Sequence, residues 1–110
     1  MKACCLNCVM KHLSQAMVIH EEEVPLGYPD HIYRVIGHMA EASRECVALY
    51  PELAGVIRDH RLAIMDSCKH IPPYADLLAY VAVLVGTEAA GLPPPGVPEP
   101  LMVTPPPADI

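Results

Sequence analysis

The sequence predicts an all-α fold, a small antiparallel bundle of four helices with an extended, proline-rich C-terminal arm. Three observations support this prediction. Apolar residues recur every three to four positions in three segments, as on one face of a helix. The 110 residues are 53% hydrophobic but include no Phe and no Trp, so a core of Leu, Ile, Val, Met and Ala is expected. Eight of the thirteen prolines fall in residues 92–110. We expect one bundle domain over residues 1–91 and a tail over residues 92–110.

The first predicted helix runs from Ala3 to Glu23. Acidic residues at positions 21–23 come at its end, and Pro25 and Gly27 break it. A helical wheel gives it an inward stripe of Cys5, Cys8, Val9, His12, Ala16 and Ile19.

The second and third predicted helices begin at well-defined start signals. Asp30 is a good N-cap for the second, and Pro51 suits the first turn of the third, which Pro72 and Pro73 stop. The inward stripe of the second is Ile32, Val35, Ile36, Met39, Ser43, Cys46, Val47 and Tyr50. That of the third is Leu53, Val56, Ile57, His60, Ile64, Cys68 and Ile71.

The fourth predicted helix, from about Tyr74 to Ala90, is apolar on every side between Leu77 and Val85. Such a helix is normally buried all round. It is too short to span a bilayer, which requires about 20 apolar residues. Three other helices cannot cover it fully, so we expect another copy or another protein to do so. Its β-branched valines leave a strand as the alternative.

The proline-rich tail, residues 92–110, is typical of an extended polyproline segment without a core of its own. We expect it to act as an arm that contacts neighbouring subunits, with a disordered tail as the alternative.

The net charge and the N-terminal sequence indicate which partners and which cellular compartment to expect. A net charge of −6 and a pI near 5.3, with scattered basic residues, argue against nucleic-acid binding. Lys11 and His12 interrupt any apolar signal-peptide region, so synthesis in the cytoplasm is expected. Five cysteines in a reducing compartment favour metal ligands or free thiols over a disulfide framework, although a particle assembled later outside the cell would escape this argument.

A cysteine–histidine stripe is the main candidate site. Cys5, Cys8 and His12 share one face of the first helix because they are spaced three and four apart. Counting about 1.5 Å per residue along antiparallel neighbours places Cys46 level with Cys8, and His60 level with His12. Three thiolates and one imidazole form a closed zinc set, so we predict structural zinc. The preferred ligands are Cys5, Cys8 and Cys46 with His12, ahead of His60.

Other interpretations of these residues remain open at this point. Cysteines often serve as small buried hydrophobes, and a histidine on an apolar face is often a core or boundary residue, as we expect for His38. The two thiols of the first helix could also form a disulfide. At the opposite end of the bundle the same counting brings together Cys68, His70, His20 and His31. These residues could form a second metal site, or the histidines could simply be scattered over the surface.

The sequence predicts that the protein is not an enzyme. It contains no G-x-S-x-G, phosphate-binding loop or H-E-x-x-H motif, and His38-x-x-Glu41 reverses the order of a di-metal carboxylate motif. The leading interpretation is a structural assembly subunit, in a homo-oligomer or with other subunits, such as a phage virion or another particle. The alternative is a small metal- or redox-responsive regulator that binds a partner protein.

Four stretches of the chain also resemble a known group of proteins. These are C-x-x-C-x-x-K-H-L (residues 5–13), GYPDH (27–31), IGHMAEA (36–42) and YPELAGVIRDHRL (50–62). Together they are similar to small helical proteins of unassigned function that phages and other mobile elements encode. The resemblance covers about residues 5–65. It implies phage or phage-like assembly as a context, and it implies no activity and no site residues.

Overall fold

The chain folds into four α-helices. The structure, a computed structural model, describes residues 2–23 and 29–103, with side chains from Leu6 in the first range and from Asp30 in the second. The helices are α1 (Lys2–Val18), α2 (Pro29–Cys46), α3 (Pro51–Asp66) and α4 (Tyr74–Ala90). A π-helical segment, η1 (Ile19–Glu23), extends α1, and a 3₁₀ turn, η3 (Glu99–Leu101), lies in the arm. The all-α prediction with four helices is confirmed. The described residues include no strand, so the strand alternative for residues 74–90 is wrong.

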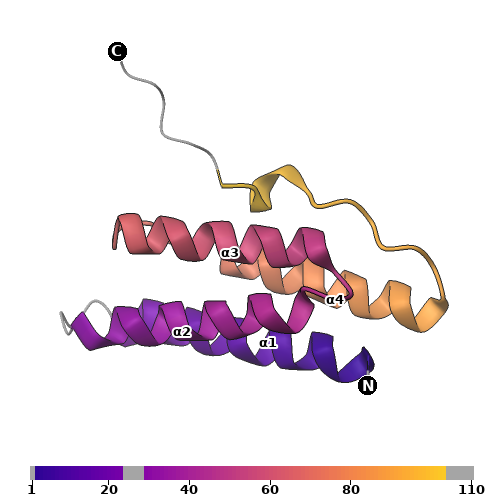
Figure 1. The fold of residues 1–110 in the computed structure, drawn as a ribbon, viewed down its shortest axis with the longest axis horizontal. Coiled ribbons are helices and arrows are strands. Elements are labelled where there is room, and N and C mark those ends of the chain that lie inside the picture. The colour runs from indigo at the N-terminus through magenta and orange to yellow at the C-terminus, as the bar shows by residue number, and fades with distance from the viewer. Residues whose placement is uncertain (1, 24–28, 104–110) are drawn as a thin grey trace, which may run out of the picture.

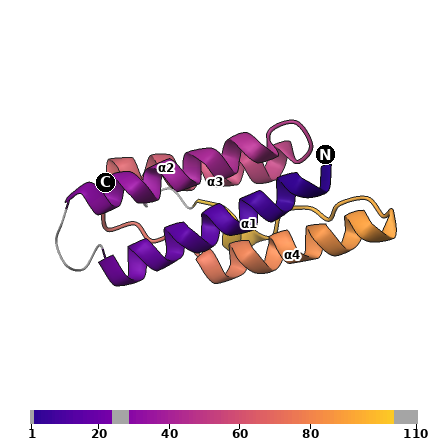
Figure 2. The ribbon, with the colours of Figure 1, turned by 90° about the horizontal axis from the view of Figure 1, so that it is seen from below.

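The four helices lie roughly along one long direction (Figure 1). The colours run leftward along α1 and α3 and rightward along α2 and α4. Helix α1 packs against both α2 and α4, and α2 also packs against α3. Figure 2, seen from below, shows α1 between α4 on one side and α2 with α3 on the other. Helices α1 and α2 therefore form the middle of the bundle, with α4 packed on α1 and α3 packed on α2.

The buried face of α1 differs from the predicted stripe. Leu6 and Leu13 are buried together with Val9 and Ala16, whereas Cys8 and His12 are only half-buried. The predicted inward stripe is therefore confirmed for Val9, Ala16 and Ile19, whereas Cys8 and His12 lie at its half-buried edge and the buried Leu6 and Leu13 were not part of it. Burying two leucines removes more apolar surface from water than burying a thiol and an imidazole, so the helix turns its aliphatic face inward.

Close packing joins α2 to α3. Ala42 and Ala54 are both buried, and the Ser43 hydroxyl donates a 2.9 Å hydrogen bond to the Ala54 carbonyl oxygen. Small side chains allow this close approach. Three residues predicted to continue the apolar stripes, Val47, Cys68 and Ile71, are exposed because they lie beyond the ends of α2 and α3.

Helix α4 buries one face only. Its inward residues are Tyr74, Leu77, Tyr80, Val81 and Leu84. Its C-terminal end is fixed by Gly91, which adopts a left-handed conformation with φ of 72°. The Gly91 amide donates to the Glu88 carbonyl, and the Leu92 amide donates to the Thr87 carbonyl. This is the pattern of a Schellman cap, which favours glycine at the left-handed position.

Residues 92–103 of the arm turn back after Gly91 and run along the bundle (Figures 1 and 2). The Tyr80 hydroxyl donates a 2.9 Å hydrogen bond to the Pro95 carbonyl. Leu101 in η3 is completely buried, and Val97 packs against the same core. Turn η3 contacts α4, and the Leu101 carbonyl accepts a 2.7 Å hydrogen bond from His60 of α3. Leu101 thus bridges α3 and α4.

Candidate functional site

The predicted cysteine site lies at the edge of the core. Cys8 on α1 is half-buried, and Cys46 at the end of α2 is fully buried. Cys5 belongs to α1, but its side chain lies outside the described residues. The structure therefore describes the side chains of two of the three cysteines in the predicted thiolate set.

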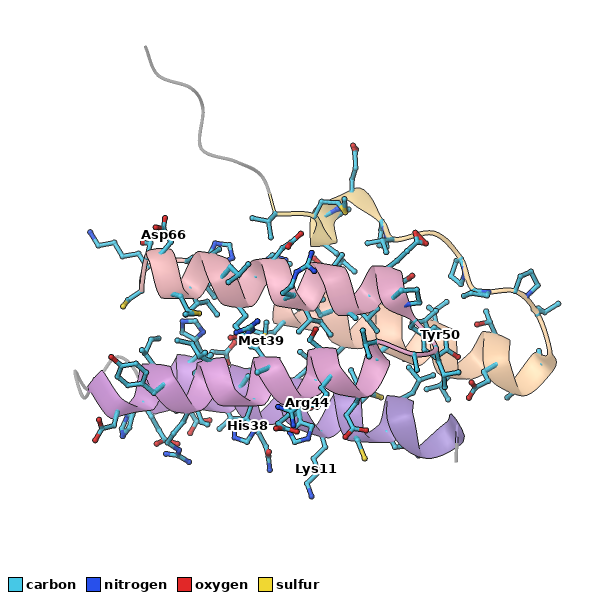
Figure 3. The ribbon with its side chains drawn as sticks, in the orientation of Figure 1. Lys11, His38, Met39, Arg44, Tyr50 and Asp66 are labelled. Carbon is cyan, nitrogen blue, oxygen red and sulfur yellow. The ribbon has the colours of Figure 1, made fainter. Side chains whose placement is uncertain are left out.

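The histidine of the same stripe, His12, faces α2. Its Nδ1 lies 3.5 Å from the Nδ1 of His38, and the ring centroids are 5.7 Å apart. Figure 3 shows His38 with Lys11 and Arg44 on the side of α1 and α2 that faces away from α3. The pKa of His38 is lowered, first by partial burial and then by the neighbouring His12 and Arg34. His38 is thus the partner of His12, a role that its expected boundary position did not reveal.

The other predicted ligand, His60, points elsewhere. Its two ring nitrogens contact His70 and the arm, whereas His12 contacts His38. The two histidines that helix counting placed together are therefore engaged with different partners. Within residues 2–23 and 29–103, as far as side chains are described, no three His, Cys, Asp or Glu side chains are grouped to hold a metal ion. Zinc at Cys5, Cys8, Cys46 and His12 stays a prediction from sequence.

A linear hydrogen-bond chain connects His70, His60 and the arm. His60, only 2% exposed, donates from Nε2 to the Leu101 carbonyl at 2.7 Å. A neutral imidazole has one N–H, so the Nδ1 of His60 must then accept a proton. It does so from the Nε2 of His70, 2.9 Å away. The ring centroids are 5.2 Å apart, and the ring planes are inclined by only 19°.

The environment of this pair favours neutral imidazoles. The pKa of His60 is lowered mainly by burial and further by His70, and these effects outweigh the bond to Leu101 and the nearby Asp59, which act in the opposite direction. Burial also lowers the pKa of His70. Both rings therefore resist protonation while the arm is docked.

A second buried contact lies at the same end of the bundle. The Nδ1 of His20, in η1, is 2.7 Å from the hydroxyl of Tyr74, the first residue of α4. The His20 Nε2 is buried and has no hydrogen-bond partner among the described residues. Burial, followed by the nearby His70, lowers the pKa of His20. Burial raises the pKa of Tyr74, with Glu21 adding to the shift.

The possible second metal cluster is dispersed in the structure. His31 donates from Nδ1 to the Glu23 carbonyl at 2.9 Å, and its Nε2 lies 3.6 Å from the Glu23 carboxylate. Cys68 is exposed. Of the four residues considered, His70 lies near enough to His20 to lower its pKa, but His70 is hydrogen-bonded to His60.

The outer face of α4 is an apolar surface. We call it the α4 outer face, defined by residues that share one side of the helix: Ala75, Ala79, Ala82, Val83, Gly86 and Ala90. All six are exposed, and Val83 is 51% exposed. A groove of about 260 Å³ runs beside this face, between α4 and the arm, and is lined by Asp76, Ala79, Tyr80, Val83, Pro98 and Pro100. Asp76 is the only charged residue in that lining.

Within the described ranges no helix combines the length and apolar character needed to cross a bilayer. Comparison with protein-family models, with curated proteins and with solved structures gave no match to this chain.

Sequence reasoning missed the hydrogen-bonded unit formed by His60, His70 and Leu101. His60 was assigned to the opposite cluster, and Leu101 was placed in a tail without a core. One signal was available, because Leu101, Met102 and Val103 form the only run of adjacent large apolar residues in the proline-rich segment 92–110. Such a run can anchor an extended segment to a core.

Proposed function

We propose that the protein is a non-enzymatic assembly subunit: an antiparallel four-helix bundle with an extended arm, which binds a second copy of itself or another subunit through the α4 outer face. The observation that carries the proposal is that this face is apolar and exposed over the length of α4. Stripes of small residues allow two helices to approach closely, so that many weak contacts can form.

The chemistry of the remaining face-lining residues supports an interface. Glu88, the acidic residue near the end of α4, is held inward by a 2.8 Å hydrogen bond from the Tyr50 hydroxyl. Thr87 is engaged with the Leu84 carbonyl of its own helix. Glu88 is thus directed inward and the Thr87 hydroxyl is satisfied within its own helix, while the exposed Asp76 lies on the same side as Val83, at the rim of the groove. Interface cores are depleted in charged residues in the same way.

The proline residues beside the face extend the same surface. Pro98 and Pro100 line the groove together with Val83 and Ala79. The arm therefore contributes to the proposed interface from its docked position on its own bundle. In this proposal a phage virion or similar particle is the expected setting, and any zinc at the cysteine stripe would stabilise the subunit rather than react.

The test is the mass of the assembly in solution. We expect the unmodified chain to form an oligomer by native mass spectrometry and sedimentation velocity, and Val83→Glu to reduce it to a monomer, because a carboxylate would be buried without a partner. Val47→Glu is the matched control, since Val47 is also an exposed valine, 62% exposed, but lies after α2. A Val83→Glu variant that still assembles would contradict the proposal, and an unmodified chain that is monomeric would contradict self-association and leave another subunit as the partner. The same native spectra would reveal a zinc-sized mass.

A further inference from the structure

We propose that His12 and His38 form a binding site for a zinc-type divalent metal ion, which joins α1 to α2 through the Nδ1 atoms of the two imidazoles. The inference does not rest on the assembly proposal, because it concerns contacts within one chain. It differs from the zinc set predicted from the sequence, in which His12 is grouped with Cys5, Cys8 and Cys46. It rests on the distance and orientation of the two rings and on the surface where they lie.

The first step of the argument is the distance between the two facing nitrogen atoms. The Nδ1 atoms of His12 and His38 are 3.5 Å apart. An ordinary hydrogen bond from an N–H group is shorter, roughly 2.7–3.2 Å. A tetrahedral zinc ion with Zn–N bonds of about 2.0–2.1 Å holds two imidazole nitrogens about 3.3–3.4 Å apart. The observed distance therefore matches two ligands of one metal ion better than it matches a hydrogen bond.

The second step is the direction of the two rings. The centroids of His12 and His38 are 5.7 Å apart, well beyond the 3.5 Å between their Nδ1 atoms, so each ring directs its Nδ1 toward the other ring. In the neutral tautomer with the proton on Nε2, Nδ1 carries a free lone pair and can ligate a metal. Two such rings present two lone pairs to one space without a proton between them. A cation satisfies both.

The third step is that the packed helices hold the two rings in place. His12 directly precedes Leu13 on α1, and His38 directly precedes Met39 on α2. Leu13 and Met39 are completely buried, and α1 packs directly against α2. Core packing therefore fixes the position of each ring along its helix. A pair that is positioned in advance loses little conformational entropy when it binds an ion.

The fourth step concerns the charges around the pair. Figure 3 shows Lys11 and Arg44 on the same side of α1 and α2 as His38. Arg44 is paired with the Glu41 carboxylate at 3.1 Å. Arg34, one turn before His38, is paired with a carboxylate of η1 at 2.8 Å. Lys11 is exposed, so water screens its charge. Carboxylates therefore offset the two arginines, whose charge would otherwise repel a divalent cation.

The fifth step is access for the ion and for the remaining ligands. Both rings are half-buried, and His38 lines a groove of about 330 Å³ between α1, η1 and α2. No third His, Cys, Asp or Glu side chain joins the pair among those that the structure describes. The site therefore has two protein ligands and leaves two positions for water. Such an open site exchanges its ion, in contrast to a closed structural zinc site.

The other four histidines of the chain are engaged differently. The Nδ1 of His20 contacts the Tyr74 hydroxyl, and the Nδ1 of His31 donates to a backbone carbonyl. His60 and His70 are 2.9 Å apart, within the range of a hydrogen bond, and the remaining ring nitrogen of His60 bonds the arm. These rings are therefore suitable controls within the same chain.

The experiment is a Zn²⁺ titration of the reduced, metal-free, full-length chain, followed by ¹⁵N NMR of the histidine rings. We expect the Nδ1 signals of His12 and His38 to move together and to saturate within two equivalents of Zn²⁺, one for this site and one left for the thiols. The rings of His60 and His70 should keep their signals. A shift of His12 without His38 would overturn the proposal in favour of the cysteine set. So would unchanged signals of both rings, or a shift only beyond two equivalents, which would be adventitious binding only.

Two variants show which side chains hold the ion. His38→Gln removes one ligand at a half-buried position. It should raise the Zn²⁺ concentration that half-saturates the His12 signal by at least about 10-fold, since the loss of even an outer-shell partner has that effect. Cys8→Ser, one turn from His12, tests the thiolate set and should leave both ring signals responding as in the unmodified chain. His70→Gln is the matched control in the other pair and should also respond normally. An unchanged His12 response in His38→Gln, or a lost response in Cys8→Ser, would overturn the proposal.

Discussion

Two histidine pairs in this bundle show how differently the same side chains can be used. His12 and His38 meet at 3.5 Å on the half-buried outer side of α1 and α2. His60 and His70 meet at 2.9 Å, and His60 is almost fully buried and bonded to the arm. A hydrogen bond in a dry environment is stronger, and leaving it unmade is more costly. The buried pair is therefore expected to carry structural consequences that the outer pair lacks.

The largest effect is expected from truncating Leu101, the residue that anchors the arm beside the buried histidine pair. We expect Leu101→Ala to lower the free energy of unfolding by about 3 kcal/mol, because it leaves a cavity where a fully buried leucine was. Urea unfolding followed by circular dichroism measures the change. Met102→Ala, at the adjacent position that is 53% exposed, should cost less than about 0.5 kcal/mol. Equal effects of the two variants would mean that Leu101 is not packed as described.

Removing one ring from each pair compares the two directly. We expect His60→Ala to cost about 2 kcal/mol, since it leaves the buried Leu101 carbonyl and the His70 N–H without their partner. His12→Ala, in the half-buried pair, should cost about 0.5 kcal/mol. The same urea titration at pH 7.5 measures both. A larger cost for His12 would reverse the comparison and would indicate that the cysteine stripe has a stronger structural role.

The turn that directs the arm back toward the buried pair gives a smaller effect. Gly91 has a φ of 72°, so a Cβ there is strained even though nothing lies within 4 Å of it. We expect Gly91→Ala to lower the free energy of unfolding by about 1 kcal/mol. Gly96→Ala is the control, because Gly96 also has open space around it but no positive φ. It should be neutral or slightly stabilising.

The smallest effect is expected from mild acidification between pH 8 and pH 6. Each of His20, His38, His60 and His70 has a lowered pKa in the folded chain, chiefly through burial. The unfolded chain binds their protons first, so stability is complete above about pH 6.5 and declines as the pH falls below it. Thermal unfolding at pH 8, 7 and 6 should show a lower Tm only at the last value. A Tm that rises at pH 6 would contradict the sign.

Local sequence patterns were sufficient for the starts of three helices, whereas the predicted second and third helices continued past the observed ends at Cys46 and Asp66. The predicted starts at Asp30, Pro51 and Tyr74 lie within one residue of those of α2, α3 and α4. Proline and glycine mark these boundaries through steric effects that act within a few residues, so no tertiary information is needed. The apolar face of α3 from Leu53 to Ile64 could also be predicted, because its apolar residues recur at regular helical spacing.

The orientation of α1 could not be derived in the same way. Its apolar residues cover a wide arc, so both a face centred on Cys8 and His12 and a face centred on Leu6 and Leu13 were compatible with the pattern. The choice depends on the total surface that α2 and α4 bury when they pack against α1. That sum involves residues far apart in sequence.

The sequence by itself determined that the chain is helical, where three of its helices begin, and that the middle of α4 is apolar on every side. Only the tertiary structure decided which face of α4 is buried, that His60 joins His70 rather than His12, and that Leu101 reaches the core. The physical reason is the distance along the chain over which each interaction acts. Helix formation and capping depend on neighbours within a turn, whereas burial and long-range hydrogen bonds depend on which surfaces meet when four helices and an arm pack together.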